Sequence, residues 1–69
     1  MVEVFKTNVQ DRGTARTIVH YLHREIPDAT INFDLEDCDK ILRISNSSFM
    51  KEDVVRMVLM LGHYCEVLE

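Results

Sequence analysis

The sequence contains little of what marks a secreted, membrane-spanning or phosphate-binding protein. It has two cysteines, Cys38 and Cys65, and no Cys-x-x-Cys pair, so a disulfide framework is not expected. A reduced cytosolic protein is the simplest interpretation. No apolar run is long enough to span a bilayer, and the first residues do not follow the pattern of a signal peptide. The two glycines do not form a phosphate-binding loop.

Groupings that would support catalysis are also missing. The only serines lie within residues 45–48, and no histidine stands at a spacing that would activate one of them. The net charge of −4 argues against nucleic acid as the main partner. We therefore expect no enzymatic activity and no cofactor, and a protein rather than a nucleic acid or a membrane as the partner.

The length and composition are those of one small globular domain. Sixty-nine residues, 46% of them apolar, allow one modest hydrophobic core, and the chain has no internal repeat and no low-complexity tract. We expect a single domain over residues 1–69.

Apolar spacing predicts the secondary structure. Within residues 12–26, apolar side chains recur every three or four residues, as in an amphipathic helix. Asp11 is the expected N-cap of this helix, and Pro27 follows its end. Residues 30–36 alternate strictly, as a half-buried strand does. The other predicted elements are strands at 2–9, 40–45 and 64–68 and a helix at 49–61, which Ser48 would cap and Gly62 would end.

The order β-α-β-β-α-β predicts an α+β, ferredoxin-like sandwich. In this topology, four antiparallel strands lie in the order 4-1-3-2, with both helices on one face and the second strand at an unpaired edge. Ile41 is expected to point to the open face. The expected core consists of Phe5 or Val4, Ile18, Leu22, Phe33, Leu35, Leu42, Val54, Val58 and Leu61, with Ile31 and Ile44 on the same face of the sheet.

The chain resembles the heavy-metal-associated domain family of small metal carriers. Members of that family have a strand ending in Met-x-Cys-x-x-Cys, and the helix that follows starts its apolar stripe four residues later. Counting back from Ile18 places Thr14 and Asp11 at the two cysteine positions and Val9 at the methionine. The Gly-His-Tyr of residues 62–64 also fits the family. The resemblance implies the ferredoxin-like fold, but without thiolates in the loop it does not imply copper transport.

Three connections are expected at the same end of this fold, and they suggest a metal site. With the predicted topology, the loop 8–14, the hairpin tip 37–39 and the turn 62–65 all meet there. The candidate ligands are Asp11, Cys38, His63 and Cys65, a set that suits a zinc-like divalent ion. The alternative is that Cys65 is a small buried hydrophobe and His63 an ordinary helix-end residue.

The first helix carries a basic row. Arg12, Arg16, His20 and Arg24 are four residues apart and therefore share one side of the helix, which we call the basic ridge. His20 and His23 also form an H-x-x-H pair, which we interpret as two solvated histidines. The ridge contrasts with the acidic cluster Asp34, Glu36, Asp37 and Asp39.

Two hypotheses follow. The first is a non-catalytic interaction module that docks an acidic protein partner, or another copy of itself, through the basic ridge. The second is a metal-binding or carrier protein that uses Asp11, Cys38, His63 and Cys65. For the ridge, a solvated helix face without a partner is the alternative.

Overall fold

The six predicted elements are present in the predicted order. The computed structural model describes residues 2–69, so residue 1 of the predicted domain lies outside the described residues. The elements are β1 (Val2–Thr7), α1 (Arg12–Glu25), β2 (Thr30–Asp34), β3 (Ile41–Ser45), α2 (Lys51–Met60) and β4 (Cys65–Leu68).

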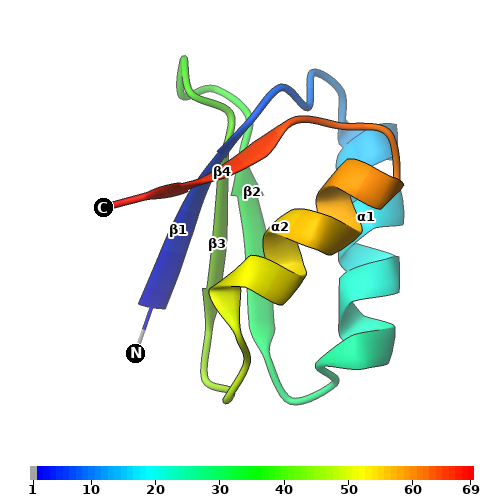
Figure 1. The fold of residues 1–69 in the computed structure, drawn as a ribbon. Coiled ribbons are helices and arrows are strands. Elements are labelled where there is room, and N and C mark those ends of the chain that lie inside the picture. Colours follow the sequence, from blue (N-terminus) through cyan, green and yellow to red (C-terminus); the bar gives the residue numbers. More distant parts are fainter. Residues whose placement is uncertain (1) are drawn as a thin grey trace.

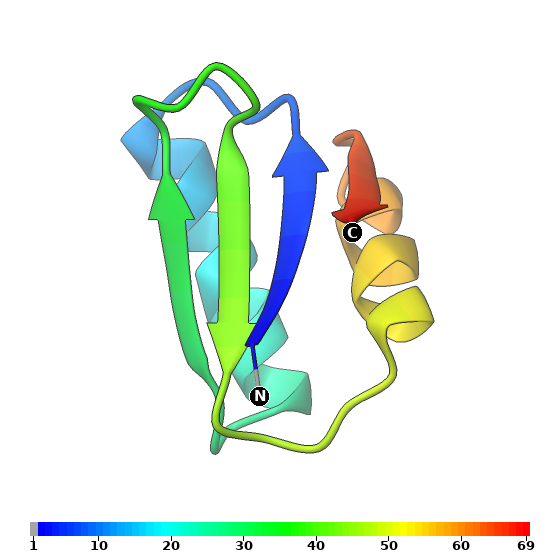
Figure 2. The ribbon, with the colours of Figure 1, turned by 90° about the vertical axis from the view of Figure 1, so that its left-hand side faces the viewer.

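The strands form one antiparallel sheet in the order β2-β3-β1-β4, which confirms the predicted ferredoxin-like topology. Both helices pack on one face of this sheet (Figure 1). The opposite face is open, as Figure 2 shows with the sheet turned toward the viewer. β2 and β4 are the two edge strands, because each pairs with only one neighbour.

The core lies between the sheet and the helices, and every element contributes to it. Six of the predicted core residues are almost fully buried: Phe5, Ile18, Leu22, Leu42, Val54 and Val58. Phe33, Leu35 and Leu61 are only partly buried and pack against this core. The remaining buried members of the cluster are Val9, Ala15, Ala29, Ile31, Ile44 and Cys65.

Ile41 departs from the prediction in one respect. The register places it on the open face, as expected, between Lys6 of β1 and Asp34 of β2. It is nevertheless only 5% exposed. The half-buried side chains of Lys6 and Asp34, which flank it on both sides, keep water from it although no helix covers this face.

The helix ends explain the remaining differences. The prediction that Ser48 caps α2 is wrong: the helix starts at Lys51, and its N-cap Met50 makes no side-chain capping bond. Phe49 instead packs against the core from the extended segment before the helix. Glu52 and Asp53 place negative charge in the first turn, where the helix dipole favours it.

The C-terminus of α2 is as predicted. Gly62 has a φ of +92°, which only glycine adopts readily. Its N–H donates to the Leu59 carbonyl and that of His63 donates to the Val58 carbonyl, the two bonds of a Schellman ending. The chain is thereby turned directly into β4.

Candidate functional site

The three connections predicted to meet do lie at one end of the molecule (Figure 1). The Thr7 N–H donates to the Asp39 carbonyl, and the Thr7 hydroxyl donates to the Lys40 carbonyl at 2.6 Å. The Tyr64 N–H donates to Asn8 Oδ1 at 2.9 Å. The β1–α1 loop is therefore tied on one side to the hairpin tip and on the other to the turn before β4.

Asp11 is occupied by a structural role in this loop. Its carboxylate accepts from the Thr14 N–H at 3.0 Å and from the Thr14 hydroxyl at 2.7 Å, as an N-cap does. These bonds hold the pKa of Asp11 below its ordinary value. Asp11 and Thr14, the two positions that resemble metal-binding cysteines, thus bind each other.

The other predicted metal ligands, Cys38, His63 and Cys65, do not form a group of three with their ligand atoms close together in residues 2–69. Cys65 is buried, whereas Cys38 is an exposed free thiol in the hairpin tip. Burial, with a smaller effect of Glu66, raises the pKa of the Cys65 thiol to about 11, which disfavours the thiolate that a metal requires. Within residues 2–69, the only three such ligands that approach one another are Asp37, Cys38 and Asp39, whose ligand atoms lie within 4.8 Å. Metal binding by the predicted set stays a prediction.

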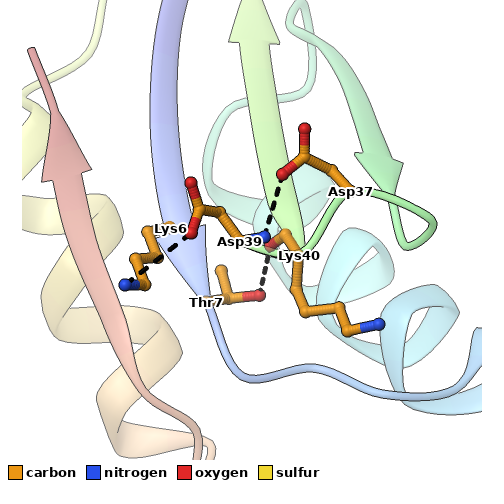
Figure 3. A network of polar contacts seen from close by, with 5 residues as sticks. All are labelled: Lys6, Thr7, Asp37, Asp39 and Lys40. Carbon is orange, nitrogen blue, oxygen red and sulfur yellow. Dashed lines mark hydrogen bonds and ion pairs between the residues drawn. The ribbon is translucent and has the colours of Figure 1, made fainter.

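The carboxylates of the hairpin tip mainly organise the tip itself (Figure 3). Asp37 accepts from the Asp39 N–H at 2.8 Å, and Asp39 pairs with Lys6 at 3.7 Å. Lys40 has a φ of +48° and donates from its ammonium to the Leu35 carbonyl at 2.9 Å. This tight turn reverses the chain between β2 and β3.

The two helix histidines differ from each other. His20 is exposed and contacts Tyr21 edge-to-face, with 5.5 Å between the ring centroids. His23 is also exposed, as predicted, and its Nε2 in addition lies 3.1 Å from the Ala29 carbonyl. Its bond fastens the end of α1 to the start of β2.

The basic ridge is exposed along its whole length, as predicted. Arg12, Arg16, His20 and Arg24 all face solvent, whereas Ala15, Ile18 and Leu22 on the other side of α1 are buried. The three ion pairs found within residues 2–69 use Lys6, Arg43 and Arg56 as their cations. The ridge arginines therefore carry charge that no carboxylate of the described chain neutralises by direct pairing.

A hollow lies beside the N-terminal half of this ridge. It has a volume of about 390 Å³ and is bounded by α1 on one side and by the edge strand β2 with the residues that follow it on the other. We call it the α1–β2 groove. Its lining residues are Arg12, Ala15, Arg16 and Val19 from the helix and Ile31–Glu36 from the strand side.

The groove is the feature that sequence patterns did not predict. The alternation of residues 30–36 and the strand order place β2 at an edge, but they do not tell how far α1 stands from that edge. Figure 2 shows the start of α1 behind β2 and projecting past its outer side. Arg12 and Arg16 of the ridge line the same hollow as this edge strand.

Comparison of the chain with protein-family models, with curated proteins and with solved structures gives no match. The resemblance to heavy-metal-associated domains stays a prediction. No helix among residues 2–69 has the length and apolar character needed to cross a membrane.

Proposed function

We propose that this chain is a small non-catalytic cytosolic interaction module that docks an acidic protein surface through its basic ridge. The observation that carries the proposal is the row of three exposed arginines without a carboxylate partner in the described chain. The planar guanidinium group of arginine binds a carboxylate through two parallel hydrogen bonds, so a row of arginines suits an acidic surface.

The charge distribution of the chain supports docking at the ridge. The chain as a whole is acidic, with a net charge of −4, so most of its surface repels an acidic partner. The ridge is the exception, and a partner would be steered toward it. Such steering raises the association rate and weakens with salt, because screening shortens to about 8 Å at physiological ionic strength.

The test reverses charge at the ridge and, as a control, elsewhere. Wild-type protein and the Arg16→Glu, Arg24→Glu variant are immobilised and used to capture partners from the extract of the source cells. The Lys51→Glu, Arg56→Glu variant changes the net charge by the same amount on α2. The proposal expects the ridge variant to lose the captured partners, the α2 variant to keep them, and the wild-type yield to fall with salt. Equal yields from both variants would mean that the ridge is only a solvated helix face.

A further inference from the structure

The α1–β2 groove combines three features that suit one kind of occupant. Its lining on the strand side consists of the consecutive residues Ile31–Glu36, which include four of the five residues of the edge strand β2. Its base is apolar, with the half-buried side chains of Val19, Phe33 and Leu35. Arg12 and Arg16 form its helix side.

We propose that this groove takes an extended acidic peptide segment of a partner protein, which adds to β2 as a fifth strand of the sheet. The proposal rests on the proposed function and specifies the form of the acidic partner. An edge strand offers N–H and C=O groups at every second residue, and an added strand satisfies them. The peptide's inward side chains would then lie over the apolar base and below the two guanidinium groups.

The charges of the groove select an acidic segment. Of the two carboxylates in its lining, Asp34 already pairs with Arg43 at 3.9 Å on the open face, which leaves Glu36 against the two arginines. The helix side of the groove therefore carries two positive charges without an ion-pair partner in the described chain, whereas the strand side carries the carboxylate of Glu36.

The inward positions of the segment follow from the spacing in a strand. Every second side chain points to the same face, so one face of the peptide carries the residues that enter the groove. An apolar residue flanked at a distance of two by acidic residues matches an apolar base beneath arginines. A suitable probe is the blocked peptide Thr-Glu-Thr-Val-Thr-Glu-Thr, whose Glu, Val and Glu share one face.

The experiment separates strand addition from simple charge attraction. The peptide is compared with two N-methylated isomers, one methylated on its Glu and Val residues and the other on its inner Thr residues. Both isomers keep the charge, but each blocks the N–H groups along a different edge of the strand. Binding to the isotope-labelled protein is followed by two-dimensional NMR.

We expect the unmethylated peptide to shift the amide signals of Ile31–Glu36 and of the first half of α1. One isomer should bind like the parent, and the other should lose about tenfold or more in affinity, as the loss of two or more hydrogen bonds implies. Arg12→Glu with Arg16→Glu should abolish binding, whereas Lys51→Glu with Arg56→Glu should not.

Three outcomes would overturn the inference. If both isomers bind as well as the parent, the peptide is held by charge alone; strand addition fails while ridge docking stands. If no peptide binds, the inference fails, and partner capture by the ridge is decided by its own experiment. If the free protein sediments as a dimer that the Arg12→Glu, Arg16→Glu variant dissociates, a second copy is the occupant instead of a peptide.

Discussion

At the scale of single residues, the loop that resembles a metal-binding motif owes its conformation to hydrogen bonds. Asp11 and Thr14 are joined by two bonds that begin α1, so the positions of the family's cysteines serve as a helix cap here. Hard oxygen ligands of this kind do not favour monovalent copper, which prefers thiolates.

We therefore expect no micromolar binding of monovalent copper at Asp11 and Thr14. The measurement is competition against a copper chelator, performed on wild type and on the Cys38→Ser, Cys65→Ser variant. Any weak binding by wild type should disappear with the two thiols. Copper retained by the variant at the same affinity would contradict the assignment of this loop to a purely structural role.

The buried thiol of Cys65 makes the stability of the fold depend on pH in the alkaline range. Burial raises its pKa from the ordinary 9.0 to about 11 in the folded protein. The unfolded chain then releases this proton at lower pH than the folded protein does. The stability that the protonated, buried thiol contributes is fully present below pH 9 and is lost as the pH rises through about 11.

Urea unfolding at a series of pH values tests this. Between pH 9 and 11, the wild-type free energy of unfolding should fall more steeply than that of Cys65→Ala, whereas Cys38→Ala should follow wild type. Tyr64, whose pKa is raised mainly by its hydrogen bond with Glu66, is present in all three proteins, and only the smallest cause of its shift, the charge of Cys65, is absent from Cys65→Ala. Parallel pH profiles for wild type and Cys65→Ala would show that the folded thiol titrates normally.

At the scale of elements, α1 has two sides with different tasks. Ala15, Ile18 and Leu22 hold it against the sheet, and the basic ridge faces outward on the other side. Its N-terminal half overhangs β2, and the contact of His23 with the Ala29 carbonyl fixes its other end. The orientation of the ridge thus depends on how the apolar side is packed.

Leu22→Ala should destabilise the protein by about 2–5 kcal/mol, because it removes a fully buried side chain and leaves a cavity. Arg24→Ala, two residues away on the exposed side, should change the stability by about 0.5 kcal/mol or less. Chemical denaturation of the two variants and wild type provides the values. A loss below about 1 kcal/mol for Leu22→Ala would contradict the packing of α1 described above.

At the scale of the whole molecule, both helices and all four strands contribute buried residues to a single apolar cluster. Residues 2–69 contain no second core that would survive if one element detached. A domain of this size buries only about 60% of the surface that its unfolded chain exposes, so its stability is shared among all elements.

We accordingly expect one cooperative unfolding transition. Far-UV circular dichroism, which reports the helices, and NMR signals of core methyl groups such as those of Ile44 and Val58 should give the same midpoint in urea. The Leu22→Ala variant should shift both midpoints together. Midpoints that separate would mean that the α2–β4 part unfolds independently of the rest.

The sequence by itself determined the elements, their order and the exposed side of α1. Local causes suffice for these: helical spacing of apolar residues, the Asp11 cap, strict alternation in β2, and Gly62 with its positive φ at the end of α2. The strand order then followed from general rules of handedness and connection.

Only the tertiary structure decided which polar side chains are free to bind a ligand or a partner. The predicted topology places Asp11, Cys38, His63 and Cys65 at the same end of the fold, which suggested them as one ligand set. In the structure, the hydrogen bonds of the helix cap engage Asp11, and packing buries Cys65. The α1–β2 groove likewise depends on how α1 is packed against the sheet. Distances between side chains on different elements depend on how the whole core is packed, and no local pattern encodes them.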